Sequence, residues 1–433
     1  MDNQVSALGD LPVLEESAGR KVYRWVILAV VWFGFLLSFV DRLIWTSVSG
    51  VAAPGFGLSV AALGSFVTSF YVGYVVSQAL TGYLIDRLGA RRLLPLALVP
   101  LGAFTFLFGS ATSAVGAIAL QSLMGLTAGA DFAAGYKLIL AWFNRGDRGK
   151  AVGLFMTATS LGVVATNFLV PPMLQVMTWT MVYEVAGIVT SIFGVVCFLA
   201  LRDNPGGERN TPIAFSDLHR LITDRQFILI ALAGFGGVWG TWGFAIWATS
   251  LMTHGLHFTT VEVGAIVGTF GIVAVFGKPA IGLLSDWLGG KRRILVMLDL
   301  FAFGALLLVT GTLSTRTQLW IVAPLLGLTA FMYSPLQNAM AAEAGGRAAG
   351  SGVGFSAAFG SIGTTIVPLV IGVAFQATQS FEVAFGVLAA GPLFGALCMI
   401  PVRDRLLDGG RADSTPKPGI LPSWRPGKLQ EKL

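Results

Sequence analysis

The chain has 433 residues, of which 55% are hydrophobic and only 12% are charged, whereas a typical soluble domain is about 25% charged. This shortage of charge and a mean hydropathy of +0.77 exclude an ordinary soluble protein and indicate a chain that spans a lipid bilayer. The net charge of +6 does not predict a nucleic-acid partner, because the basic residues lie in loops between apolar segments.

Apolar segments of about twenty residues or more follow one another along the chain, and each can cross about 30 Å of hydrocarbon as an α-helix. Backbone polar groups in hydrocarbon must be paired internally, and these long uncharged runs lack the alternation of barrel strands. We therefore predict an all-α membrane protein with twelve transmembrane helices, at 24–50, 60–84, 92–112, 115–142, 148–175, 180–202, 225–254, 260–286, 293–313, 318–343, 349–376 and 381–402.

A polar stretch after the sixth helix divides the chain into two sets of six helices. The N-terminal residues lack the short apolar region and cleavage site of a signal peptide, and the C-terminal residues are polar and rich in proline. The predicted domains are a cytoplasmic N-terminal segment (1–23), an N-terminal bundle (24–202), a cytoplasmic linker (203–224), a C-terminal bundle (225–402) and a disordered cytoplasmic tail (403–433).

The basic residues are distributed asymmetrically. Of the 28 Lys and Arg residues, Arg42, Lys137 and Lys278 fall inside predicted spans and Arg316 falls in an outer loop. All the others lie in alternate loops on one side or in the terminal segments, which is the positive-inside pattern. It predicts a multi-pass protein of the inner (plasma) membrane with both termini in the cytoplasm.

A sequence motif occurs twice, each time just after the second helix of its half. The first copy has Gly82, Asp86, Arg87, Gly89, Arg91 and Arg92, and the second has Gly282, Asp286, Gly289, Lys291 and Arg292. Glycines at these places favour a tight turn, and the basic residues favour the inner face. Duplicated halves are a transporter plan in which the substrate site lies near the midplane between them.

The segment Gly82–Arg92 resembles the signature loop of the major facilitator superfamily, G-x-L-x-D-R-x-G-R-[RK], with Ala90 as one departure. This resemblance implies two pseudo-symmetric six-helix bundles that transport a small molecule by alternating access, with no enzymatic activity and no cofactor. Phe39-Val-Asp-Arg42, followed by the second helix with Phe70 to Gln78, resembles the anion/cation symporter branch. Members of that branch carry organic acids together with protons or sodium.

Placing a charged side chain at the depth of the bilayer core costs at least about 2.5 to 3.5 kcal/mol of free energy. Each such residue must therefore face a cavity or a partner. Arg42 offers a planar fork that suits a carboxylate, and we expect it to anchor the substrate. Asp41 can take up a proton in a low dielectric, and we expect it to couple transport to H+. The alternative is a structural pair that braces the first helix against a neighbour.

Lys278 precedes Pro279 in the predicted eighth helix. A basic residue at this place resembles the monocarboxylate and oxalate carriers, in which it binds the carboxylate. The repeat offset places Lys278 opposite Gln78 of the first half. The alternative is a lysine that extends to the inner headgroups.

The fourth predicted helix carries Asp131 and Lys137. Anion/cation symporters commonly have an acidic residue earlier in this helix, where this chain has Ala128, and a basic residue near Lys137. Asp131 is therefore a second candidate for proton coupling, while anion exchange remains an alternative. Lys137 is a candidate ligand or an ordinary interfacial lysine.

Aromatic and amide residues complete the predicted site. Helix 225–254 combines glycines with Trp239, Trp242 and Trp247, which indicates either a bending helix with aromatic faces over a ligand or close helix packing with a belt tryptophan. The candidate cavity residues are Trp45, Tyr71, Tyr74, Gln78, Trp239, Trp242, Tyr333, Gln337 and Asn338.

No phosphate loop, metal-ligand cluster or nucleophile elbow is present in the sequence, so we expect neither an enzyme nor an ATP-driven pump, and no metal site. The sequence predicts a monomeric secondary transporter that moves a small organic anion (a carboxylate) by proton symport. An anion exchanger, a drug or metabolite exporter of the same fold and a transporter-like ligand sensor are the alternatives.

Overall fold

The computed structural model describes residues 18–58, 60–202, 221–345 and 349–403. The predicted tail and most of the predicted N-terminal segment and linker lie outside these residues. In the first half the structure contains α1 (Ala18–Ala52), the short 3-10 helix Ala53–Phe56, α2 (Val60–Leu88), α3 (Ala90–Gly109), α4 (Ala114–Ala128), α5 (Asp131–Trp142), α6 (Arg145–Val176) and α7 (Trp179–Ala200). In the second half it contains α9 (Arg225–Leu256), α10 (Thr260–Trp287), α11 (Arg292–Thr312), α12 (Arg316–Gly345), α13 (Ala349–Thr378) and α14 (Phe381–Met399).

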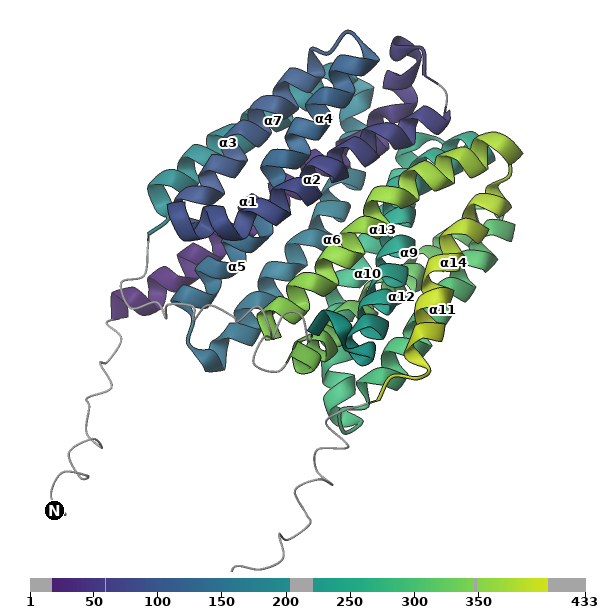
Figure 1. The fold of residues 1–433 in the computed structure, drawn as a ribbon. Coiled ribbons are helices and arrows are strands. Elements are labelled where there is room, and N and C mark those ends of the chain that lie inside the picture. The colour runs from purple at the N-terminus through teal and green to yellow at the C-terminus, as the bar shows by residue number, and fades with distance from the viewer. Residues whose placement is uncertain (1–17, 59, 203–220, 346–348, 404–433) are drawn as a thin grey trace, which may run out of the picture.

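The helices form two bundles that lie side by side, α1 to α7 in one and α9 to α14 in the other (Figure 1). Within the described residues, 11 helical spans are long and apolar enough to cross a membrane, with α4 and α5 forming one of them. The 29-residue α2 packs among them against α4 and α13. The predicted all-α membrane fold is confirmed.

Close helix packing explains the glycines inside the bundles. A Cβ atom on Gly102 of α3 would lie 2.5 Å from the carbonyl oxygen of Gly187 in α7, and a Cβ on Gly187 would meet the Gly102 oxygen at the same distance. In a bilayer, where apolar burial between helices gains little, small residues let two backbones approach and pack. The pair therefore fixes the α3–α7 contact.

The predicted helix 115–142 is broken at Gly129 and Ala130, which corrects the expectation of one continuous helix. A Cβ on Gly129 would lie 2.5 Å from Cβ of Ser77, so α4 ends where it is packed tightly against α2. Asp131 begins α5, and its carboxylate accepts a hydrogen bond from the backbone N–H of Phe132 at 2.5 Å. The break places this acidic side chain at a helix N-terminus inside the bundle.

Both copies of the repeated motif place a glycine with positive φ between two helices. Gly89 has φ +78° between α2 and α3, and Gly289 has φ +73° between α10 and α11. These left-handed conformations explain why glycine stands at both positions. Arg292 forms an ion pair with Glu343 that ties α11 to α12. The side chain of Asp86 lies outside the described part of the structure.

The two halves contact each other between their centre and one face of the protein. The chain enters α1 and leaves α14 at the same end, which we call the terminal face (Figure 1). Towards the opposite face, Thr68 of α2 donates a hydrogen bond to the carbonyl oxygen of Thr365 in α13 at 2.9 Å. A Cβ on Gly264 of α10 would lie 2.5 Å from the Asn167 oxygen of α6. The halves are therefore tightly closed on the side away from the termini.

Candidate functional site

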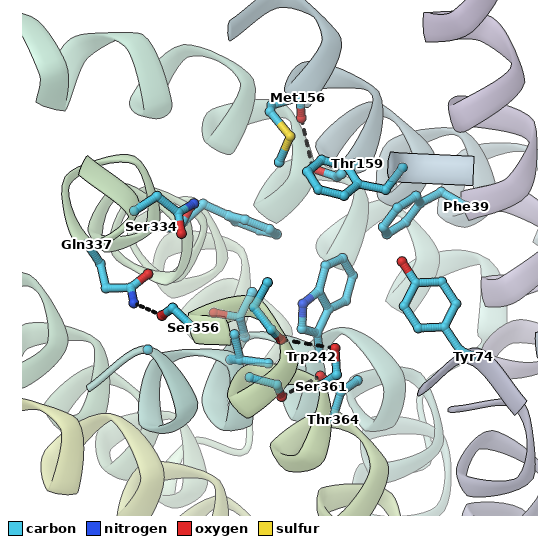
Figure 2. Close-up of a pocket in the computed structure, with 18 of the residues that line it drawn as sticks. Phe39, Tyr74, Met156, Thr159, Trp242, Ser334, Gln337, Ser356, Ser361 and Thr364 are labelled. Carbon is cyan, nitrogen blue, oxygen red and sulfur yellow. Dashed lines mark hydrogen bonds between the residues drawn. The ribbon is translucent and has the colours of Figure 1, made fainter. Parts of the chain in front are cut away.

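A cavity of about 210 Å³ lies between the two halves. Its walls come from α1, α2, α5 and α6 in the first half and from α9, α10, α12 and α13 in the second. Figure 2 shows side chains of both halves around it. The lining residues are Phe35, Phe39, Arg42, Tyr71, Tyr74, Gln78, Phe132, Met156, Thr159, Gly234, Val238, Thr241, Trp242, Lys278, Phe331, Tyr333, Ser334, Gln337, Asn338, Ser356, Ala357, Gly360, Ser361 and Thr364.

Arg42 lies on the first-half wall among aromatic rings. Its guanidinium carbon is 4.3 Å from the ring centroid of Phe39 and 4.4 Å from that of Tyr74. Its Nη2 atom is 3.7 Å from Oδ2 of Asp131, and neither Nε nor Nη2 has a hydrogen-bond partner among the described residues. Arg42 is thus held by rings and one carboxylate while part of its donor capacity stays unused.

Asp131 lies behind Arg42 and is fully buried. Its Oδ2 atom accepts a hydrogen bond from the hydroxyl of Ser38 in α1, and it faces Arg42 through the same oxygen. Asp131 itself does not line the cavity. It therefore acts on the cavity through Arg42, whose charge it partly balances.

Lys278 lies on the second-half wall and reaches across to the first half. Its Nζ donates a hydrogen bond to Oγ1 of Thr159 in α6 at 2.8 Å and is 3.5 Å from the carbonyl oxygen of Met156. It also lies 4.7 Å from the ring centroid of Phe331. Lys278 forms no ion pair with any residue that the structure describes. The side chain thus points into the cavity instead of extending to the headgroups.

Gln78 has a position in the first half that corresponds to Lys278 in the second. Its Oε1 accepts a hydrogen bond from Oγ of Ser361 in α13 at 3.3 Å. Each of the two residues therefore bonds to the opposite half, Gln78 from α2 to α13 and Lys278 from α10 to α6. The two contacts form a pseudo-symmetric pair at the cavity, one neutral and one charged.

The cavity brings together most of the predicted site residues. Those that line it are Arg42, Tyr71, Tyr74, Gln78, Trp242, Lys278, Tyr333, Gln337 and Asn338. They come from five helices, so the fold gathers residues that are up to about 300 positions apart in the sequence. Apart from Arg42 and Lys278, none of the residues lining the cavity is charged.

Other predicted residues lie outside the cavity lining. Asp41 points to a different side of α1 from Arg42, beside the hydroxyls of Thr105 and Thr190, because neighbouring residues on a helix point about 100° apart. Its Oδ2 has no hydrogen-bond partner within the described part of the chain. Lys137 lies in α5 but is not among the cavity residues.

Two predicted tryptophans also serve packing contacts. Trp45 is buried and stacks on Phe66 with ring centroids 4.3 Å apart, nearer the face opposite the termini than Arg42. Trp239 donates from Nε1 to the carbonyl oxygen of Val387 at 3.0 Å, and so packs against α14. Both are outside the cavity lining.

Helix α9 is continuous, so its glycines serve close packing and not a bend. A Cβ on Gly236 would lie 2.2 Å from the Gly391 oxygen of α14, and one on Gly237 would lie 2.4 Å from the Tyr333 ring. Trp247 is 2% exposed and donates to the Pro368 carbonyl oxygen at 3.0 Å. It therefore joins α9 to α13 within the second half and is not a belt residue.

Sequence reasoning missed a group of apolar and hydroxyl residues at the cavity. Aromatic and hydroxyl side chains are common on every face of a membrane helix, so residue type alone gives no signal for them. Only the repeat relation, which pairs α6 with α13, could have drawn attention to Thr159 and Ser361. The missed lining residues include Phe35, Phe39, Phe132, Thr159, Phe331 and Ser361.

The sequence profile of the Major Facilitator Superfamily matches residues 30–368. The chain belongs to this superfamily. Its members are transporters and not enzymes. The match covers nearly all of the first half and most of the second, which agrees with the two-bundle fold and with the duplicated motif.

Curated relatives place this superfamily member near carriers of sugar acids. It is 23% identical over 418 residues to the probable galactarate/D-glucarate transporter GudP of Bacillus subtilis (strain 168), covering 88% of this chain and 92% of that protein. It is 23% identical to the D-galactonate transporter of Escherichia coli O6:H1, covering 90% and 97%. The hexuronate transporter of Escherichia coli K12 is 24% identical, with coverage of 87% and 93%. The resemblance to the anion/cation symporter branch is confirmed.

Solved structures support the fold. A bacterial homologue of the human lysosomal transporter Spinster, in an inward-facing and unoccupied conformation, matches with a TM-score of 0.68 at 15% identity, covering 88% of this chain and 94% of that one. The occupied form of the same kind of protein matches with a TM-score of 0.69 at 14% identity, covering 92% and 99%. At these identities the likeness concerns the fold alone.

Proposed function

We propose that this protein is a secondary active transporter that moves a small organic anion, a carboxylate, across the inner membrane by alternating access. The observation that carries the proposal is Lys278, a cation on the cavity wall without an acidic partner among the described residues. A buried charge without a counter-ion is costly, and a negatively charged cargo would remove that cost. The sugar-acid carriers among the relatives support a carboxylate cargo.

The charges around the cavity favour an anion over a cation. Arg42 and Asp131 roughly balance each other, and Lys278 leaves the cavity with an excess positive charge. A cationic cargo would meet Arg42 and Lys278 with no carboxylate on the wall itself. An exporter of cationic drugs is therefore disfavoured on electrostatic grounds.

Coupling to protons would act through Asp131. A cargo carboxylate at Arg42 competes with Asp131 for the same guanidinium, because Nη2 of Arg42 faces Oδ2 of Asp131 at 3.7 Å. A proton on Asp131 would release Arg42 for the cargo, and loss of the proton would restore the pair and expel the cargo. Asp41, buried on the other side of α1, is a second proton site in this proposal.

The direction of opening follows from the contacts between the halves. The Thr68–Thr365 hydrogen bond closes the side away from the termini, so the cavity would exchange cargo through the terminal face in this conformation. The positive-inside distribution of Lys and Arg supports a cytoplasmic location for that face. Rocking of the halves about the cavity would then expose the cargo to the other side.

The test is uptake by the purified protein in liposomes, with a panel of radiolabelled mono- and dicarboxylates and with an inward proton gradient. We expect saturable uptake of at least one carboxylate, driven by the gradient and reduced at least about tenfold in Arg42→Ala and in Lys278→Ala. Uptake at unchanged apparent affinity in both variants would overturn the site. Binding without any flux would instead identify a ligand sensor.

Anion exchange is the second candidate, and the buried Arg42–Asp131 pair is the observation that favours it. If Asp131 stays charged throughout the cycle, only another anion can reset the carrier. Counterflow of labelled against unlabelled carboxylate, without any response to a proton gradient, would select exchange over symport.

A further inference from the structure

The two cations of the cavity are joined by a continuous row of aromatic rings. The guanidinium of Arg42 lies 4.3 Å from the Phe39 centroid, which lies 5.4 Å from that of Trp242. Trp242 lies 6.2 Å from Phe331, with the ring planes at 88°. The ammonium of Lys278 lies 4.7 Å from Phe331 at the far end. We call Phe39, Trp242 and Phe331 the aromatic row; Figure 2 shows Phe39 and Trp242 of this row.

All three residues of the row line the cavity, and they come from both halves of the protein. Phe39 belongs to α1, Trp242 to α9 and Phe331 to α12. Phe35 and Phe132 extend the aromatic wall beside Phe39. The ring centroid of Phe35 lies 5.8 Å from that of Phe132. Ring pairs at such distances attract a further ring in edge-to-face or offset geometry. The row therefore offers a planar cargo a matching surface.

Some of the hydroxyl and amide groups on the walls already form hydrogen bonds within the protein. Thr241 donates to the carbonyl oxygens of Gly237 and Ala330, at 2.9 and 2.5 Å. The amide nitrogen of Gln337 donates to Ile230 O at 3.2 Å and to Ser356 Oγ at 2.5 Å. A cargo with many hydroxyls would have to break such bonds or leave its own groups unpaired, at about 1–3 kcal/mol for each unpaired buried group.

We propose that the cargo is an aromatic carboxylate, whose ring lies along the aromatic row and whose anionic group meets Arg42 or Lys278. This inference rests on the proposed function and narrows it to a substrate class. The cavity volume of about 210 Å³ is below the roughly 300 to 1,000 Å³ of typical ligand pockets. The site therefore suits an acid with a single ring. Cargo of this kind differs from the sugar acids in the names of the relatives.

The experiment measures equilibrium binding to the purified full-length protein by calorimetry, with four probes. Benzoate and terephthalate carry a ring and a charge, glucarate carries charge without a ring, and benzamide carries a ring without charge. We expect at least one aromatic acid to bind at least tenfold more tightly than both glucarate and benzamide. Equal or tighter binding of glucarate would overturn the aromatic cargo and leave the proposed carboxylate transport intact.

Benzamide tests whether the anionic group of the cargo contributes to binding. If benzamide binds as tightly as benzoate, the anionic group contributes nothing and the carboxylate transport itself is contradicted. If none of the three acids binds, both proposals fail. The two failures are therefore distinguishable by which probe binds.

Two tryptophans of α9 provide matched variants. Trp242 belongs to the aromatic row, whereas Trp239 packs against α14 through its hydrogen bond to Val387. Trp242→Leu should weaken the binding of the aromatic acid at least tenfold, and Trp239→Leu should leave it within about twofold. Equal losses in both variants, with thermal melting unchanged, would overturn the role of the row. Should Trp242→Leu fail to fold, Phe331→Leu tests the same row from α12.

Discussion

Residue 78 and residue 278 occupy corresponding places in the two halves, but the first is glutamine and the second is lysine. Gln78 bonds to Ser361 in the opposite half, and Lys278 bonds to Thr159 in the opposite half. Each contact joins a side chain to a hydroxyl group of the opposite half. Only Lys278 introduces a charge without an acidic partner among the described residues. The duplicated scaffold therefore repeats its geometry while it differs in charge at the cavity.

The turns after α2 and α10 behave in the opposite way. Gly89 and Gly289 are the same residue, and both have a positive φ. These turn glycines are thus retained in both copies, whereas residues 78 and 278 at the cavity differ in charge. The two halves therefore share a structural glycine and diverge at the cavity.

The largest expected effect comes from the charged pair of the first half. Arg42→Gln leaves Asp131 buried without its cation, and breaking a buried pair costs about 3–5 kcal/mol. We expect loss of anion uptake and a clearly lower melting temperature. The double variant Arg42→Gln/Asp131→Asn should recover the melting temperature but not the uptake. Recovered uptake in the double variant would show that Arg42 does not bind the cargo.

The single variant Asp131→Asn tests whether anion transport is coupled to protons through this residue. The amide keeps the hydrogen-bonding shape beside Ser38 but cannot exchange a proton, so accumulation driven by a proton gradient should disappear. Counterflow exchange of labelled anion should persist, because the cargo site is intact. Asp41→Asn is the companion variant. If proton-driven accumulation survives in both single variants and in the double variant, proton coupling through these residues is excluded.

Moving the positive charge from position 278 to position 78 tests whether the two halves of the cavity are equivalent. Lys278→Gln makes the two corresponding positions alike, and a lost charge-assisted contact of about 1.5–3 kcal/mol predicts a roughly 10- to 100-fold rise in the apparent KM for the anion. Adding Gln78→Lys returns a cation to the same cavity from the other half. We expect this double variant to recover part of the affinity in an uptake assay. No recovery would mean that geometry at Lys278 matters more than net charge.

The smallest effect on transport is expected at the turns that contain Gly89 and Gly289. Gly89→Ala and Gly289→Ala each force a positive φ on a residue with a Cβ, at about 1–3 kcal/mol. We expect similar decreases in melting temperature for the two variants and an unchanged apparent KM for the anion. A large change in apparent KM in one variant only would break the structural equivalence of the turns.

The fold was predictable because the lengths of the apolar segments and the repeated motif can be recognised directly in the sequence. The twelve spans, the division into halves and the glycine turns all follow from such local signals. The break at Gly129 did not follow, because it depends on the contact with Ser77 of another helix. A contact between distant segments leaves no periodic pattern in the sequence.

The site was predictable only in part. Charge at bilayer depth singled out Arg42 and Lys278, and both line the cavity. Residue type could not tell that Trp239 and Trp242, three positions apart on α9, have different neighbours. Nor could it identify Phe39 and Phe331, because phenylalanine is frequent throughout the chain. Which face of a helix meets the cavity is decided by packing against the other helices.

The uncompensated charge of Lys278 is the central claim, and its most direct test is a dissociation constant. Purified wild-type protein and the Lys278→Gln variant are titrated with the tightest-binding carboxylate of the panel, with Lys278→Arg as the charge-retaining control. We expect binding at least about tenfold weaker in Lys278→Gln and a smaller change in Lys278→Arg. An unchanged dissociation constant in Lys278→Gln would contradict it.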